Sequence, residues 1–149
     1  MVRLRPHMIV GPRAHRFSNL LARSRFYPKF RDPQPRIQCV HEDDVAAAIV
    51  AALFSDARGA FNLAPADSIS VREARRLLHR VPLALPLPAT RTLIRGIRGL
   101  LGIGPETAWV QTLRYNLVLH SQRARRELGW NPRYDSVQDC LKALSPARG

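Results

Sequence analysis

Residues 37–64 read IQCVHEDDVAAAIVAALFSDARGAFNLA, and this stretch decides the fold. Its alternating segment at 37–40 predicts a short strand, and its alanine-rich segment at 45–54 predicts a helix. Asp43 or Asp44 is expected to cap that helix, because carboxylates suit the positive end of a helix dipole. Since the helix is apolar nearly all round, we expect it to be buried between two layers.

Strand signals lie on both sides of this helix. Arg58-Gly59 is typical of a turn, and the apolar run at 60–64 after it predicts a buried strand. Upstream, residues 2–10 (VRLRPHMIV) predict another strand, in which Pro6 requires an edge, a bulge or a strand end. Strands separated by helices indicate the α/β class.

In the remaining segments, helix-capping residues and helix-breaking residues predict where the elements begin and end. Ser70, with Glu73 three residues on, forms a capping box and predicts a helix to His79. Residues 17–26 and 90–101 predict helices, 27–35 a loop, 81–88 an extended segment and 117–119 a short strand. Ser121 is expected to cap a helix that runs to Leu128 and stops at Gly129, and Ser136 to cap a last one to about residue 144.

The chain is strongly basic. Its 24 Lys and Arg residues against 11 Asp and Glu give a formal net charge of +13, and all the basic residues except Lys29 and Lys142 are arginine. Such a charge attracts anionic ligands and nucleic acid. The arginines are scattered along the chain, and no zinc-finger spacing or RNA-recognition signature accompanies them, so we do not expect nucleic acid as a partner.

No membrane or metal site is expected. The apolar stretches are far shorter than the roughly 20 residues of a membrane span. Cys39 and Cys140 form no metal-ligand pattern, and we interpret them as reduced thiols in a cytoplasmic protein. His41-Glu42-Asp43 is not a metal site either, because adjacent helical residues point in different directions.

Three segments, in this order, carry a resemblance to a known family. They are residues 4–12 (LRPHMIVGP), residues 38–48 with 59–64 (QCVHEDDVAAA and GAFNLA), and residues 121–132 (SQRARRELGWNP). The first resembles the sixth-strand motif of the NAD-dependent epimerase/dehydratase family, the extended short-chain dehydrogenases/reductases. The second is similar to that family's Val-His-Val-x-Asp-Val-Ala helix and the strand after it, and the third to its C-terminal Leu-Gly-Trp-x-Pro element.

The resemblance implies an α/β fold that is the C-terminal part of a Rossmann-like extended short-chain dehydrogenase. We expect two or three sheet strands in an incomplete sheet, with a mostly helical substrate-binding part. The prediction is one partial domain over residues 1–149: the sixth strand with its helix and loop at 1–35, a strand–helix–strand–helix return to the sheet at 36–80, and the substrate-binding part at 81–149.

The family's catalytic elements are not found in this sequence. Its glycine fingerprint, which binds the cofactor, would precede residue 1, and none of Tyr27, Tyr115 and Tyr134 has a lysine at the fourth following position. Gly96, Gly99 and Gly102 have the fingerprint's spacing but follow no predicted strand. We therefore predict that the chain is catalytically incomplete, assign no catalytic residue, and expect that NAD or NADP serves the intact family member without binding to this chain alone.

The resemblance implies candidate binding residues at the positions that match the family's binding segments. Pro6, His7, Met8 and Ile9 match the segment that lines the family's nicotinamide pocket. Candidate substrate-binding residues for a nucleotide sugar are Arg36, Gln38, His41 and Arg123. An arginine such as Arg36 can bind a diphosphate bidentately; the alternative is that Arg36 is one more solvated surface arginine.

Two questions of partnership stay open at this stage. Strands of a parallel sheet are normally paired on both edges and covered on both faces, so we expect poor stability unless a complementing N-terminal half or a homo-oligomer covers them. The alternative to an epimerase, dehydratase or reductase portion is a non-catalytic basic module that binds anionic ligands or a partner protein.

Overall fold

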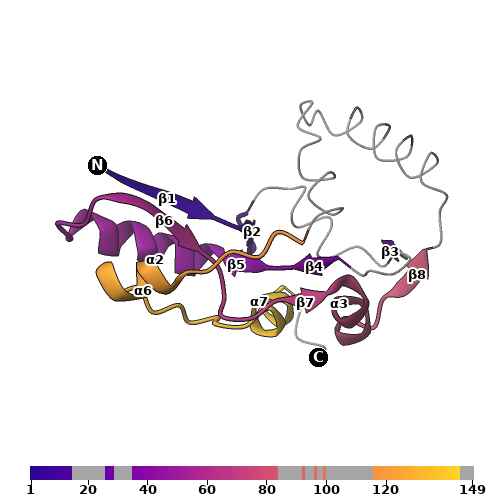
Figure 1. Cartoon of the computed structure of the whole chain (residues 1–149). Coiled ribbons are helices and arrows are strands. Elements are labelled where there is room, and N and C mark those ends of the chain that lie inside the picture. Colours follow the sequence, from indigo (N-terminus) through magenta and orange to yellow (C-terminus); the bar gives the residue numbers. More distant parts are fainter. Residues whose placement is uncertain are drawn as a thin grey trace.

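The computed structural model describes residues 1–14, 26–28, 35–83 and 116–144, with isolated positions at 92, 96 and 99. These residues contain both strands and helices, and three of their four strand pairs are parallel, which confirms the α/β class (Figure 1). The predicted helix at 90–101 lies outside the described residues except at those three positions. The predicted helix at 17–26 also lies outside them, apart from Phe26.

The main parallel pair joins two segments far apart in the sequence. Strand β1 (Val2–Pro6) pairs in parallel with β6 (Gly59–Leu63), in a register from Val2 opposite Gly59 to Pro6 opposite Leu63. Helix α2 (Glu42–Leu53) connects to β6 and packs on β1. Figure 1 shows β1, β6 and α2 grouped with α6 on the side of the molecule where the chain begins.

The expected single strand at 2–10 is interrupted at His7. Beyond it, β2 (Met8–Val10) pairs in parallel with β5 (Cys39–His41) instead of with β6. The His7 backbone N–H donates to Leu63 O at 2.9 Å, and the Met8 N–H donates to the His7 side chain at 2.8 Å. The histidine therefore ends one ladder, and the chain changes partner at this point.

Two shorter pairs complete the described strands. Strand β3 (Phe26–Pro28) pairs in parallel with β8 (Val81–Leu83), so the loop prediction is wrong at Tyr27 and Pro28 and the helix prediction is wrong at Phe26. Strand β4 (Arg36–Ile37) pairs antiparallel with β7 (Ile69–Ser70). The predicted strand at 117–119 is not formed, because the backbone of Leu119 bonds to a side chain rather than to a strand.

The helix ends follow local chemistry. Helix α3 (Val71–Leu77) has the predicted capping box, with Ser70 Oγ accepting from Glu73 N and Glu73 Oε2 accepting from Ser70 N. Gly129, at φ +64, ends the turn after α6 (Gln122–Glu127), as predicted. Ser136 caps α7 (Val137–Ala143) as predicted, whereas Ser121 makes no side-chain cap bond to α6.

The prediction that Asp43 or Asp44 caps α2 is wrong. His41 is the N-cap, and its Nδ1 accepts from the Asp43 N–H at 3.3 Å. Asp44 is buried within the first turn and accepts instead from the backbone N–H groups of Arg133 (2.6 Å) and Tyr134 (3.0 Å). The acid thus joins α2 to the segment that follows α6.

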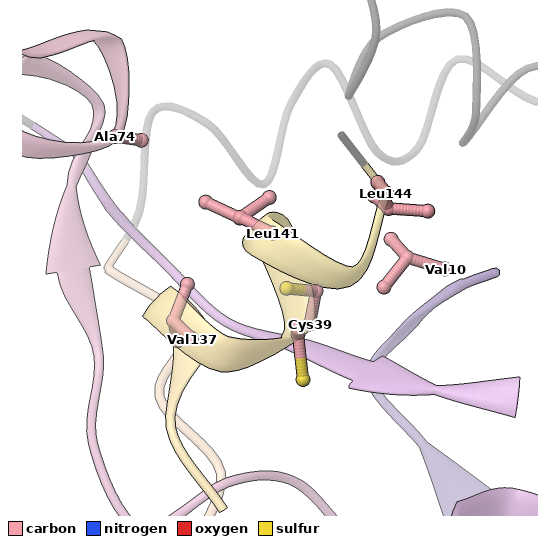
Figure 2. Close-up of a cluster of buried hydrophobic side chains, with 7 residues drawn as sticks. Val10, Cys39, Ala74, Val137, Leu141 and Leu144 are labelled. Atoms are coloured by element: carbon pink, nitrogen blue, oxygen red, sulfur yellow. The ribbon is translucent and has the colours of Figure 1, made fainter. Parts of the chain in front are cut away.

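Two apolar cores hold these elements together. In the first, α7 packs on β5, and Figure 2 shows Val137, Leu141 and Leu144 gathered around Cys39 and Val10. The second lies under α2 and α6, and its buried members are Val40, Ala48, Phe61, Leu63, Ala124, Leu128 and Trp130. Trp130 is fixed there by its Nε1–H, which donates to Asp44 O at 2.8 Å.

Helix α2 is not buried all round as expected. Only Asp44 and Ala48 are buried within it, while Leu53 is 75% exposed and the C-cap residue Phe54 is 88% exposed. Its apolar character is therefore divided between a buried face and an exposed one. Among the described residues, no helix combines the length and apolar content that crossing a membrane requires.

Candidate functional site

The carboxyl ends of β1 and β6 meet at one edge of their sheet. Pro6 lies opposite Leu63 at the end of the ladder, and His7 follows directly. In open α/β sheets, ligands bind in the crevice beyond the carboxyl ends of parallel strands. The predicted site residues are therefore expected to lie at this edge.

His7 lies at that edge with both ring nitrogens engaged. Nδ1 accepts from the Met8 N–H at 2.8 Å, which leaves Nε2 to carry the proton and face Leu117 O at 3.4 Å. Burial lowers the pKa of His7, partly offset by its hydrogen bond to Leu117 O. The ring is thus held as a neutral imidazole that joins β1 to the segment at 116–119.

Gln38 makes the most complete set of bonds at this edge. Its side chain is buried between β4 and β5, and Oε1 accepts from the Leu119 N–H at 2.7 Å. Nε2 donates to Asp67 O (3.1 Å) and Leu119 O (3.2 Å), with Pro65 O at 3.5 Å. The amide therefore ties the loop after β6 to the segment at 116–119 and has little capacity left for a ligand.

Arg36 lies beside Gln38 but is exposed. Its guanidinium donates from Nε to Ser68 Oγ at 2.8 Å and from Nη2 to Ser68 O, and its backbone N–H donates to Asn116 Oδ1 at 3.0 Å. These partners are a neutral hydroxyl and a carbonyl; within the part of the chain that the structure describes, the charge of Arg36 acts on the Glu73 carboxylate but no carboxylate is hydrogen-bonded to its guanidinium. Arg36 therefore presents a cation that an anionic ligand can engage.

The structure thus brings three of the predicted residues together. His7, Gln38 and Arg36 come from different strand ends, yet each bonds to the segment at 116–119. Asp67, Ser68 and Asn116 belong to the same place and were missed in the sequence. A signal for Asp67-Ser68 was available, because polar residues in the loop after a strand lie near its carboxyl end, and these two follow Leu63 by four and five positions.

The other three residues of the segment at 6–9 have different surroundings. Met8 packs against the first core and Ile9 against the second, so these side chains point to opposite faces of their strand. Pro6 is partly buried at the end of β1. Apart from His7, this segment offers a ligand its backbone and apolar surface.

His41 lies away from this edge. It is buried, and the centre of its ring lies 4.2 Å from the ring centre of Tyr134. Its Nδ1 faces Asp43. Its bonds hold the start of α2 to the segment near Tyr134.

Arg123 lies at the opposite end of β6. Its guanidinium donates to Ala60 O (3.2 Å) and Arg58 O (2.8 Å), pairs with Glu127 at 2.9 Å, and stacks 4.5 Å from the ring centre of Phe61. The hydrogen bond from Arg123 lowers the pKa of Glu127. The structure therefore does not bring Arg123 together with Arg36 and Gln38.

The described residues hold no group of three or more histidine, cysteine or acidic side chains that could bind a metal ion. Cys39 and Cys140 are free, buried thiols within the first core. The hydrogen bond with Cys140, together with burial, raises the pKa of the Cys39 thiol. Such a thiol is protonated and inert, in keeping with a structural role.

Comparison with known proteins supports the fold. The chain matches no family model and no curated protein sequence. Among solved structures it is similar to a UDP-glucose 4-epimerase from Thermotoga maritima with UDP-glucose, at 19% identity and a TM-score of 0.60, over 96% of this chain and 44% of that one. It is also similar to a UDP-glucuronic acid 4-epimerase from Bacillus cereus in complex with NAD, at 16% identity and a TM-score of 0.59, over 95% and 40%.

A third similar structure is RMD from Pseudomonas aeruginosa complexed with NADPH, at 14% identity and a TM-score of 0.60, over 96% and 45%. The chain thus spans less than half the length of each of these proteins. Its fold is part of the extended short-chain dehydrogenase fold, as expected from the sequence.

Proposed function

We propose that this chain forms the substrate-side part of an NAD(P)-dependent sugar-nucleotide epimerase, dehydratase or reductase. The observation that supports this most is the convergence of His7, Arg36 and Gln38 beyond the carboxyl ends of β1 and β6. The similar structures from Thermotoga maritima, Bacillus cereus and Pseudomonas aeruginosa contain UDP-glucose, NAD and NADPH, respectively.

Arg36 is the residue we propose to bind the ligand's diphosphate. Its present partner, Ser68, is a neutral residue, and a planar guanidinium forms stronger, bidentate bonds with phosphate oxygens. Gln38 and His7 act as positioning residues, because their polar atoms are already bonded to the backbone around Leu119 and Leu117. We assign His41 and Arg123 structural roles, since their described partners lie outside this edge.

A nicotinamide cofactor fits the described residues only in part. The backbone and apolar surface at 6–9 suit a nicotinamide ring, which supplies hydride transfer when bound. The residues that the structure describes include no glycine-rich turn between a strand and a helix that would cradle a pyrophosphate. We therefore propose that this chain alone neither holds NAD(P) tightly nor turns over a substrate.

Calorimetric titration with UDP-glucose and with UDP tests the proposal. Binding is expected to weaken about tenfold in Arg36→Gln, the usual effect of losing one charged contact. Arg126→Gln is the matched control, because Arg126 is exposed on α6 away from the site. Absence of binding to UDP-glucose and UDP by the folded chain, or equal affinity in both variants, would contradict it.

The net charge of +13 supports one competing function, a basic module for anionic polymers. A gel shift with duplex DNA distinguishes the two, since phosphate-backbone binding falls steeply and log-linearly with salt. Strong, salt-sensitive DNA binding without affinity for UDP-glucose would favour the basic module over the enzyme portion.

A further inference from the structure

The loop that joins β6 to β7 is held in place by the segment around the start of α7. The Ala66 N–H donates to Asp135 O at 3.1 Å and to Asp135 Oδ1 at 3.2 Å. Asp67 Oδ1 accepts from the Val137 N–H at 2.7 Å, and Asp67 O accepts from Gln38 Nε2 at 3.1 Å. Two consecutive exposed residues of this loop are therefore fixed by distant parts of the chain.

The Asp67 carboxylate acts as a cap that reaches α7 from outside. Val137 is the first residue of α7, and the first N–H groups of a helix have no partner within it. Ser136 Oγ accepts from the Asp139 N–H at 3.0 Å, while Asp67 accepts from Val137. The role of Asp67 here is to supply an acceptor oxygen, and a neutral amide oxygen can fill the same place.

Ser68, the next residue in the loop, bonds to one edge of the Arg36 guanidinium. Nε donates to Ser68 Oγ at 2.8 Å, and Nη2 donates to Ser68 O. A guanidinium carries five N–H donors in one plane, so these bonds use the edge formed by Nε and Nη2. No residue in the described part of the chain bonds to the other edge, which Nη1 and Nη2 form. That edge can bind two phosphate oxygens at once.

The side chain of Arg36 is the part that depends on this loop. Its backbone is fixed separately, by pairing with Ser70 and by the N–H that donates to Asn116 Oδ1 at 3.0 Å. Ordering an exposed arginine side chain costs conformational entropy, and a ligand binds more tightly when the side chain is ordered beforehand. Ser68 therefore prepares Arg36 for an anion before the anion arrives.

We propose that Asp67 is a positioning residue for anion binding. By accepting from the Val137 N–H it fixes the loop, which places Ser68 where it directs the outer edge of the Arg36 guanidinium toward a diphosphate. This inference rests on the proposed function of Arg36. It also makes binding at the strand ends depend on the docking of α7.

A neutral variant separates positioning from the effect of charge. A carboxylate close to an anion site weakens binding by repulsion if its charge is what matters. Asp67→Asn keeps an acceptor oxygen and removes the charge, whereas Asp67→Ala removes both. Positioning therefore predicts that the alanine variant alone loses affinity.

Calorimetric titration with UDP measures the difference. We expect Asp67→Ala to weaken binding about fivefold, through the lost ordering of one long side chain, and Asp67→Asn to bind at least as tightly as the unchanged chain. Asp56→Ala is the matched control, because Asp56 is exposed ahead of the amino end of β6, whereas the site lies at the carboxyl end. Its affinity for UDP should equal that of the unchanged chain.

Two further measurements separate positioning from a general loss of structure. In the Arg36→Gln chain, Asp67→Ala should cause no further loss of affinity, because the group that it positions is absent. Without any ligand, NMR should show faster exchange of the Arg36 Nε–H with water in Asp67→Ala and not in Asp67→Asn. If Asp67→Ala does not fold, Ser68→Ala, which removes the acceptor of that Nε–H, takes its place in both measurements.

Several results would overturn the proposal. They are unchanged UDP affinity in Asp67→Ala, an equal loss in Asp67→Asn, an equal loss with and without Arg36, and unchanged exchange of the Arg36 Nε–H. A folded, unchanged chain that binds no UDP would contradict the proposed function instead. The exchange of the Arg36 Nε–H would then decide by itself whether Asp67 positions this arginine.

Discussion

Replacing Gln38 with leucine tests whether its amide holds the two loops of the candidate site together. The substitution keeps a similar side-chain volume in a position that is 1% exposed. It leaves three backbone groups without their present partner: the Leu119 N–H, Leu119 O and Asp67 O. Pro65 O, at 3.5 Å, is too weakly bonded to add much.

The expected loss follows from those three groups. At roughly 1 kcal/mol for each buried group left unpaired, the free energy of unfolding should fall by about 3 kcal/mol. For a chain of this size, that corresponds to a decrease in Tm of roughly 10 °C. Urea unfolding followed by tryptophan fluorescence measures it, since Trp130 is buried in the second core.

A matched control is available in the same chain. Gln122 is exposed on α6, so Gln122→Leu should change the stability by less than about 0.5 kcal/mol. Hydrogen exchange adds a local readout, because the Leu119 N–H should lose protection in Gln38→Leu alone. If Gln38→Leu is as stable as the control and the Leu119 amide stays protected, the amide does not hold these loops.

The remaining predictions concern other polar groups. Asp44→Ala removes the acceptor of the Arg133 and Tyr134 N–H groups and should cost about 3 kcal/mol in urea unfolding, whereas a loss below about 1 kcal/mol would contradict the role of this bridge. Ser70→Ala should cost about 1 kcal/mol through loss of the cap. The hydrogen bonds from Ser70 lower the pKa of the Glu73 carboxyl. Ionised Glu73 therefore stabilises the fold above the ordinary glutamate pKa, and this stabilisation is lost as the pH falls through the lowered pKa of the folded state. Glu73→Gln should reduce this acid sensitivity of the free energy of unfolding. Burial lowers the pKa of His7, so the neutral ring favours folding above the ordinary histidine pKa and this contribution declines as the pH falls; an NMR titration midpoint at or above that of a histidine peptide would contradict it.

Local sequence signals predicted the local features well. The Ser70–Glu73 capping box, the Ser136 cap and the Gly129 turn all depend on bonds or dihedral angles within a few residues. Strands at residues 2–10 and 60–64 were also predicted from their local patterns, but that the two segments pair with each other was not. These features need no knowledge of which distant side chains meet.

Features set by distant contacts were not accessible. Asp44 accepts from residues almost 90 positions away, and this tertiary demand leaves the cap of α2 to His41. Pro6 correctly indicated a strand end within 2–10, because β1 ends there, but the pattern gives no sign that the chain then changes its pairing partner from β6 to β5. Arg123 appears in the sequence as one basic residue among many, and only the structure shows it beside the carbonyls of β6.

Both cores depend on the last third of the chain, and this has a consequence for synthesis on the ribosome. Val10 and Cys39 can be buried only after residues 137–144 have been synthesised, because these residues complete the first core. Val40 and Phe61 likewise need residues 124–130, which complete the second core. Neither apolar cluster can close while the C-terminal helices are still being translated. The nascent chain therefore exposes its strands for most of its synthesis, and a premature stop codon before residue 124 would release a product with both clusters open.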